Sequence, residues 1–310
     1  MSVVSSNIRV EKVDSYTGHR DAVYGLTHTD IETDFFSSSG DGYVVRWTMQ
    51  NPDLGIPVAK VKNSIYSIFY DSRTNYLWIG HNFDGVHLID LSTRTELHRV
   101  SLGNVALFDI KGVDNRILVG DSSGCLTWLD RFTGKLVKQQ KISSKSIRTL
   151  AVQEVENRLL VGSSDNFIYV LESTSGKLMY TLEGHTNSVF SLQCLKFGNQ
   201  LVSGGRDAQL IYWELDKEKG HLITRVPAHL YTINSLDVSM DGKWLASGSL
   251  DKSVKIWDTQ TYELVKVIDR GRHAGHGTSV NKVMWQKEGV LLTASDDRTV
   301  SYWKIDFSRL

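Results

Sequence analysis

The stretch Ala228–Asp258, AHLYTINSLDVSMDGKWLASGSLDKSVKIWD, decides the fold, because much of the chain repeats its pattern. Four of its positions carry the repeat: His229, Ser247, Asp251 and Trp257. The same residue types, with Thr replacing Ser once, recur in three further sets at nearly the same spacing: His19, Ser37, Asp41, Trp47; His185, Ser203, Asp207, Trp213; and His276, Thr293, Asp297, Trp303. Self-similarity at a period of about 40 residues indicates a repeat architecture.

Two registers extend the repeat over the whole chain. The position that ends each third strand holds Trp or an aliphatic residue and recurs every 40 to 46 residues: Trp47, Ile89, Leu129, Leu171, Trp213, Trp257 and Trp303. A β-branched residue that opens each first strand recurs every 40 to 47 residues: Val23, Ile65, Val105, Ile147, Val189, Ile233 and Val280. The two series move together, so we expect insertions to fall between units and not inside them.

The apolar pattern within each unit predicts short strands. Another apolar residue stands three positions after each opener, as Leu26 follows Val23. Strict alternation would place the two on opposite faces, so we predict a β-bulge in each first strand. The second strands are apolar runs that end in small residues, such as LLVG and WLASG. Such runs are typical of strands buried on both faces.

These motifs resemble the WD-repeat family, in which a Trp-Asp pair ends each unit of a β-propeller. The resemblance implies an all-β, seven-bladed WD-repeat β-propeller with four-stranded antiparallel blades, formed by residues 1–310 as a single domain. Few residues follow Trp303, so we expect an N-terminal strand within residues 7–17 to complete the last blade, whose other strands lie in 277–306. Closure of this kind leaves the ring without a free edge.

In the family, the His, Asp, Ser and Trp of a repeat form a structural hydrogen-bond network. A Ser-His-Asp hydrolase triad is the alternative, but one active site would not recur four times with an indole donor in it. Repeats two to four lack most of the network, so we expect apolar packing to replace it there. In these repeats Asp165 is the one network position that keeps its residue type. The other network positions hold Val61, Ile79, Phe83, Ile89, Ser101, Val119, Ser123, Leu129, Ser143, Val161 and Leu171.

Composition bears on which ligands and which cellular compartment the protein has. Lys+Arg and Asp+Glu both number 35, so no global positive field attracts nucleic acid or an anionic membrane. Only Cys125 and Cys194 are present, which favours a reducing compartment, and neither a signal segment nor an apolar span is recognisable. We therefore expect a cytoplasmic protein that is a monomer or a subunit of a larger complex.

No catalytic, cofactor or metal residue is predicted. Nucleotide-binding loops, zinc-protease pairs and nucleophile elbows are missing from the sequence. The segment His273-Ala-Gly-His276 holds two His residues, but a third ligand is lacking nearby and His276 already belongs to the repeat pattern. We expect an elongated loop there and no enzyme activity.

The family resemblance implies partner binding on the face where the chain enters the first strands. Two positions of each repeat project there: the residue after the opener and the residue before the network Asp. Among these positions the candidates for partner binding are Tyr24, Tyr66, Arg148, Phe190, Arg206, Asn234, Leu250, Asn281 and Asp296. The other five of these fourteen positions hold small or polar residues, Gly40, Asn82, Ala106, Ser122 and Ser164, and are not candidates.

These residues predict a non-catalytic scaffold that binds a protein or peptide, since aromatic residues and Arg dominate interface hot spots. The alternative is an enzyme or small-ligand binder that uses the channel mouth, which predicts carboxylates or a His with a shifted pKa in a central pocket. Stacking of single-stranded nucleic acid on the aromatics is the third possibility. The aromatic side chains could also simply fill the mouth.

Overall fold

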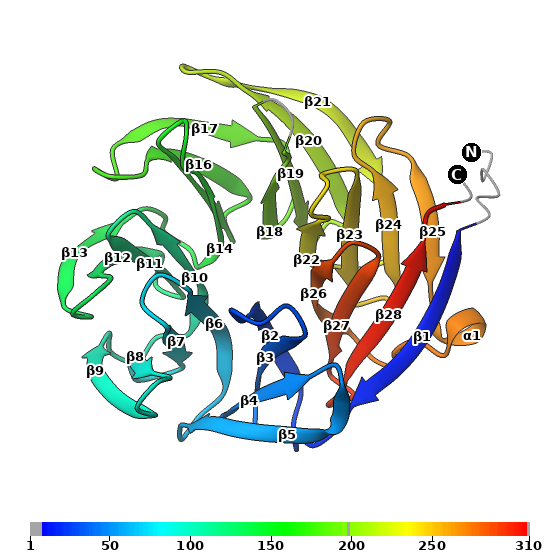
Figure 1. Ribbon diagram of the computed structural model, residues 1–310. Coiled ribbons are helices and arrows are strands. Elements are labelled where there is room, and N and C mark those ends of the chain that lie inside the picture. The colour runs from blue at the N-terminus through cyan, green and yellow to red at the C-terminus, as the bar shows by residue number, and fades with distance from the viewer. Residues whose placement is uncertain (1–7, 197–198, 309–310) are drawn as a thin grey trace.

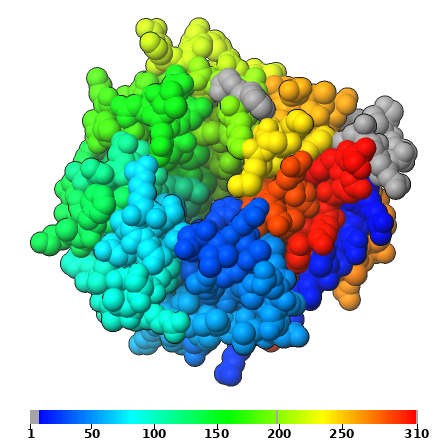
Figure 2. Space-filling model, viewed as in Figure 1, coloured from blue at the N-terminus to red at the C-terminus, as the bar shows by residue number. Residues whose placement is uncertain are grey.

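The computed structural model describes residues 8–196 and 199–308, and it confirms the seven-bladed β-propeller. Within these residues, 28 strands form seven four-stranded antiparallel sheets. The sheets stand as blades around a central channel, with the first strand of each blade innermost (Figure 1). Figure 2 shows one face of the closed ring, with a hollow at its centre.

The blades are numbered here from the first complete one. The strands of blades 1 to 4, from the channel outward, are β2 Val23–His28, β3 Asp34–Ser39, β4 Tyr43–Thr48, β5 Asn51–Lys60; β6 Ile65–Asp71, β7 Tyr76–His81, β8 Gly85–Asp90, β9 Thr95–Ser101; β10 Leu107–Val113, β11 Arg116–Asp121, β12 Cys125–Asp130, β13 Leu136–Lys141; β14 Ile147–Gln153, β15 Arg158–Ser163, β16 Phe167–Glu172, β17 Leu178–Glu183.

Blades 5 to 7 follow the same order, except that the last blade takes its outermost strand from the other end of the chain. Their strands are β18 Val189–Cys194, β19 Gln200–Gly205, β20 Gln209–Leu215, β21 Gly220–Pro227; β22 Ile233–Val238, β23 Trp244–Ser249, β24 Val254–Asp258, β25 Leu264–Ile268; β26 Val280–Lys287, β27 Val290–Ser295, β28 Val300–Asp306, β1 Arg9–Tyr16.

The N-terminal strand closes the ring as the sequence predicts. β1 pairs antiparallel with β28, from Arg9 opposite Asp306 to Tyr16 opposite Val300. The strand lies inside the expected range 7–17, whose first residue is outside the described part of the chain. This pairing gives blade 7 its fourth strand and joins the two ends of the chain in one sheet.

The core lies between neighbouring blades and not within them. Consecutive residues of β3 show why: Phe35 packs into a cluster shared with blade 7, whereas Phe36 packs into one shared with blade 2. Successive side chains of a strand point to opposite faces, and both faces of each inner strand are covered. This is the reason why the second strands are continuous apolar runs.

The predicted bulge is present in every first strand. The register of β2 shifts between Val23 and Gly25, and the six other first strands shift at the corresponding place. The bulge brings Val23 and Leu26 into the same apolar cluster. Each bulge also leaves one residue turned out of the strand pairing, as Tyr24 is in blade 1.

The expected opener of blade 3 is wrong. Leu107, not Val105, takes the position of Val23, because Leu107 pairs with Asp121 as Val23 pairs with Ser39. The hairpin between the first two strands of this blade is therefore two residues shorter than that of blade 1. A length change thus falls inside a unit, which contradicts the expectation that it would fall only between units.

The expected elongated loop contains one short helix, α1, Arg270–His273. Asp269 caps the helix through a hydrogen bond from the Arg272 backbone N–H, and Ala274 ends it with a positive φ of 53°. His273 lies on this turn while His276 belongs to the network of blade 7. Over the described ranges, no helix is long and apolar enough to cross a membrane.

Candidate functional site at the channel mouth

The bulge residues of the seven first strands form a ring around one mouth of the central channel. We call this set the mouth ring: Tyr24, Tyr66, Phe108, Arg148, Phe190, Asn234 and Asn281. All seven side chains are half-buried and line a hollow of about 500 Å³. The sequence register placed Ala106 at the blade 3 position; the shorter hairpin puts Phe108 there instead.

Five of the seven side chains of the mouth ring form a continuous aromatic and cationic stack. Tyr24 contacts Tyr66 edge to face at 4.7 Å between ring centres, and Tyr66 stacks on Phe108 at 5.8 Å. Arg148 continues the series, with its guanidinium carbon 4.1 Å from the centre of Phe108 and 4.4 Å from that of Phe190. These side chains come from five successive blades, so the packing of neighbouring blades is what brings them together.

The stack holds two polar groups in a low-polarity setting. Burial, with the neighbouring Tyr66 as the next cause, raises the pKa of Tyr24 to about 12, so its hydroxyl is neutral. Burial lowers the pKa of Arg148 from its ordinary value, and the charge of Arg206 lowers it further. An Arg remains charged in a protein, so Arg148 places a positive charge among aromatic faces.

The other two side chains of the mouth ring are amides that link blades. The side-chain amide of Asn234 donates to the backbone oxygen of Val280 at 2.9 Å, and that of Asn281 donates to the backbone oxygen of Val23 at 3.1 Å. Asn281 also donates to Asp296 at 2.7 Å. The donors of these two candidates are therefore already engaged in joining neighbouring blades.

The three remaining candidates stand outside the hollow on exposed turns. Arg206, Leu250 and Asp296 are exposed, and the side chain of Leu250 keeps 47% of its accessible surface. Phe83, which the sequence assigned to the network position of blade 2, lines the hollow instead and is 58% exposed. An exposed phenyl ring beside an aromatic hollow extends its apolar surface.

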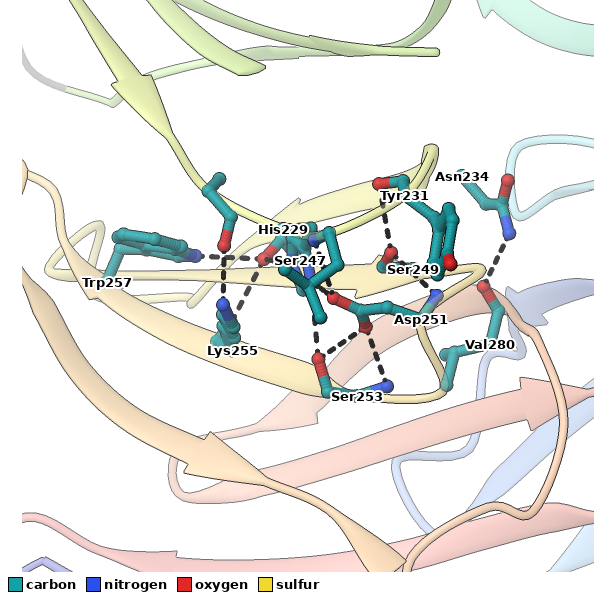
Figure 3. Close-up of polar contacts among 12 residues, drawn as sticks. His229, Tyr231, Asn234, Ser247, Ser249, Asp251, Ser253, Lys255, Trp257 and Val280 are labelled. Atoms are coloured by element: carbon teal, nitrogen blue, oxygen red, sulfur yellow. Dashed lines mark hydrogen bonds and ion pairs between the residues drawn. The ribbon is translucent and has the colours of Figure 1, made fainter. Parts of the chain in front are cut away.

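The four network sets each form a hydrogen-bonded chain, shown for blade 6 in Figure 3. The Nε1 of Trp257 donates to the Oγ of Ser247 at 2.8 Å, and this Oγ lies 2.7 Å from the Nε2 of His229. The Nδ1 of His229 lies 2.9 Å from a carboxylate oxygen of Asp251. Every bond has a donor and an acceptor if His229 is neutral and protonated at Nδ1.

The protonation states agree with this chain. Burial lowers the pKa of His229, although Asp251 opposes the shift. Burial disfavours the charged form of Asp251 as well, but hydrogen bonds from His229, Ser253 and the backbone N–H of Leu230 hold the pKa of this carboxyl well below its usual range. A neutral His beside a carboxylate with an apolar Trp at the far end is a structural link and lacks an exposed nucleophile.

The other three copies have the same geometry. His19, His185 and His276 place Nδ1 at 2.8 to 3.1 Å from their Asp partners and Nε2 at 2.7 to 2.8 Å from the Ser or Thr hydroxyl. The indole donors complete each chain at 2.8 to 2.9 Å. The residues concerned are Ser37, Asp41, Trp47, Ser203, Asp207, Trp213, Thr293, Asp297 and Trp303.

Blade 4 keeps a polar cluster that the sequence analysis did not foresee. The Oγ of Ser143 lies 2.5 Å from Asp165 and 2.8 Å from Ser163, and the hydroxyl of Tyr169 donates to Asp165 at 2.6 Å. The inner positions are apolar as expected, since Val161 is fully buried. Apolar packing therefore replaces the network at Val161 and Leu171 as expected, but a hydrogen bond joins the His and Asp positions, Ser143 and Asp165.

Blade 2 also has a polar cluster, made of His81, Asp84 and His87. The Nδ1 of His81 lies 3.0 Å from Asp84 and 3.1 Å from the Nε2 of His87, separations that three ligands of one metal ion could also have. However, the backbone N–H of Asn63 donates to the Nε2 of His81 at 3.1 Å, so Nδ1 carries the ring proton. The protonated Nδ1 donates a hydrogen bond and has no lone pair for a metal.

Carboxylates do face the central channel, as the enzyme alternative predicts. Asp109 lines both the mouth hollow and an adjoining one of about 240 Å³, and burial raises the pKa of Asp237 in the latter. Each accepts a backbone N–H from the next blade: Asp109 from Leu150 at 2.8 Å and Asp237 from Trp285 at 2.6 Å. Ser191 and Ser235 accept equivalent bonds, so this ring of contacts joins the first strands together.

Comparisons with known proteins agree with the fold. Residues 176–214, 220–258 and 268–304 match the WD40 family, described as WD domain, G-beta repeat. The solved WD40 β-propeller domain of Doa1 superposes with a TM-score of 0.83 over 97% of this chain and 98% of that one, at 21% sequence identity.

Curated relatives are similar over single stretches. Protein HIR1 of Cryptococcus neoformans is 35% identical over 94 residues, which are 30% of this chain and 10% of that protein. Actin-interacting protein 1 of Caenorhabditis elegans is 33% identical over 79 residues, 26% of this chain and 13% of that protein. The chain thus spans a small part of these relatives. With three matched WD40 repeats, four networks and seven blades, the chain resembles the WD-repeat family and has its β-propeller fold.

Proposed function

We propose that the protein is a non-catalytic scaffold that binds a segment of a partner protein over the mouth ring. The observation that carries the proposal is the stack of Tyr24, Tyr66, Phe108, Arg148 and Phe190 around an open hollow. Aromatic and Arg side chains that are already held in place lose little conformational freedom on binding, which makes them effective anchors.

The rest of the molecule supports a binding role over a catalytic one. The His, Ser and Asp side chains of the repeats are engaged in the networks, and Asp109 and Asp237 are engaged by backbone N–H groups of the next blade. One relative, actin-interacting protein 1, is by its name a protein-binding protein. Scaffolding by this chain is the corresponding proposal, with the identity of its partner left to experiment.

The test is capture of partners from native lysate with the wild-type protein and a Tyr24→Ala/Phe190→Ala/Arg206→Glu variant. We expect a partner that the wild type retains and the variant loses. The matched control is Leu97→Ala/Leu178→Ala, which removes apolar surface from the outer strands β9 and β17, where these side chains are 45% and 51% exposed. All three proteins must melt at the same temperature.

The control separates two interfaces. A partner lost by the mouth variant and kept by the outer-strand variant supports the proposal. If the outer-strand variant loses the partner and the mouth variant keeps it, the interface lies on the rim of the blades and the proposal is wrong.

A further inference from the structure

We infer that the hollow at the mouth ring is a receptor for a single carboxylate, carried by an acidic residue of the partner next to an aromatic or apolar one, and that Arg148 binds it. This inference rests on the proposed function and specifies the chemistry of the segment that enters the hollow. Its basis is the environment of one guanidinium group.

Arg148 is fixed in position but unpaired. The rings of Phe108 and Phe190 lie 4.1 and 4.4 Å from its guanidinium carbon. The N–H groups at the edge of the guanidinium are not engaged in this way. Among the described residues, the buried Nε of Arg148 has no hydrogen-bond partner, and no carboxylate forms an ion pair with the side chain. A guanidinium has five N–H donors, all of which lie in its plane, so stacking leaves its hydrogen-bonding capacity unused.

The acidic group nearest in the lining is committed elsewhere. Asp109 accepts the backbone N–H of Leu150 at 2.8 Å and lies 3.9 Å from Lys111. Arg206 acts on Arg148 with a like charge. Lys282 lines the same hollow, although burial lowers the pKa of its ammonium group. The hollow is therefore electropositive at Arg148 although the net charge of the chain is zero.

The shape and the charge together select the ligand. A volume of about 500 Å³ walled by Tyr24, Tyr66 and Phe108 accommodates one or two side chains. A carboxylate accepts two parallel N–H bonds from one guanidinium, and such charge-assisted pairs are strong. A phosphate dianion carries more charge and is typically held by several donors, whereas one fixed guanidinium in an aromatic pocket matches a monoanion.

The experiment uses small probes, so it does not depend on finding the partner. Phenylacetate, phenyl phosphate and the neutral phenylacetamide are each titrated into the full chain, with binding followed by saturation-transfer NMR. We expect phenylacetate to bind more tightly than both others. In Arg148→Gln, its affinity should fall about tenfold or more, the effect of losing a charge-assisted hydrogen bond.

Two more variants complete the test. Arg148→Lys keeps the charge but loses the planar donor pair, so it should bind phenylacetate with intermediate affinity. Arg20→Gln, which removes an exposed Arg that does not line the hollow, should bind as the wild type does. The comparison of the three probes on the wild type needs no variant and stands even if Arg148→Gln fails to fold.

The inference is wrong if phenylacetamide binds as well as phenylacetate, or if Arg148→Gln keeps the wild-type affinity. Tighter binding of phenyl phosphate would overturn the assignment to a carboxylate. None of these results touches the scaffold itself: loss of a captured partner in the mouth variant would still support docking there. Conversely, probe binding without any captured partner would support the receptor and count against the scaffold.

Discussion

Blades 1, 5, 6 and 7 differ from blades 2, 3 and 4 in the side chains at two buried positions, one on the second strand and one on the third. In blade 6 the pair is Ser247 and Trp257, joined by a hydrogen bond of 2.8 Å. In blade 4 the pair at the same register is Val161 and Leu171, both fully buried and apolar. Both kinds of blade have four strands, the same bulge and the same pairing order.

The difference shows that either a hydrogen-bonded pair or an apolar pair can occupy these two positions in the same blade architecture. Removing one partner of a buried hydrogen bond leaves the other unsatisfied, whereas replacing both by apolar groups is close to neutral. This explains why the two positions change together along the chain. What all blades retain is the bulge, and the bulge is what builds the mouth ring.

Deletion of residues 1–16 should have the largest effect on stability, because blades with the hydrogen-bond network and blades with apolar packing both depend on a closed ring. β1 contributes the buried Tyr16, which contacts Phe35 at 4.9 Å between ring centres, and Ile8 just before the strand is buried as well. Loss of each such side chain costs about 2–5 kcal/mol, against a total stability of about 5–15 kcal/mol. The truncated chain should show no cooperative thermal unfolding by circular dichroism; a single sharp transition near that of the full chain would contradict closure by β1.

A double-mutant cycle on one network blade should give the next largest effect. Ser247→Val should lower the free energy of unfolding by about 2–5 kcal/mol, since His229 and Trp257 each lose a partner and an orphaned group costs about 1–3 kcal/mol. In a Trp257→Leu background the same change should cost about 1 kcal/mol less. Urea denaturation of the four proteins measures the coupling.

The reciprocal change in blade 4 is the control for that cycle. Val161→Ser introduces a hydroxyl where Leu171 offers no donor, so it should destabilise and show no coupling to position 171. Equal costs for Ser247→Val in both backgrounds would mean that the hydrogen bond does not link the pair.

The pH dependence of stability should show a smaller effect. Burial lowers the folded pKa of His229 below the unfolded value of about 6.5, so the unfolded chain takes up a proton first as the pH falls. This contribution to stability is present above about pH 6.5 and is lost below it. Burial alone would raise the pKa of Asp297, but hydrogen bonds with His276 and Thr299 lower it to about 2. Its contribution to stability is therefore present above about pH 4 and is lost as the pH falls below that value.

His229→Gln isolates the His contribution. Between pH 7.5 and 5.0, the wild type should lose more stability in urea denaturation than the variant does, by up to about 2 kcal/mol for one group. An equally steep loss in the variant would show that His229 is not held neutral by the fold.

The repeat made most of the fold predictable from the sequence. The Trp register places Trp47, Ile89 and Leu129 at equivalent positions of β4, β8 and β12, and the spacing of Val23 and Leu26 predicts the bulge correctly. Network residues follow directly because their spacing within a blade is fixed by strand pairing.

The mouth ring was harder to predict, for two physical reasons. Val105 and Leu107 lie two positions apart and so would share a face of a strand; only the shorter hairpin decides that Leu107 opens β10 and that Phe108 reaches the mouth. The stacking of Arg148 joins three blades and is not encoded in local spacing. The His81-x₂-Asp84-x₂-His87 spacing was visible, but it lies off the repeat register and its role depends on the N–H of Asn63.

Hydrogen–deuterium exchange of the captured complex against the free protein tests the scaffold claim most directly, since exchange reports which backbone segments a partner covers. The account predicts slower exchange at the starts of the first strands, residues 21–25, 63–67, 105–109, 145–149 and 187–191. Slower exchange confined to the outer strands β9, β13 and β17, with these starts unchanged, would contradict it.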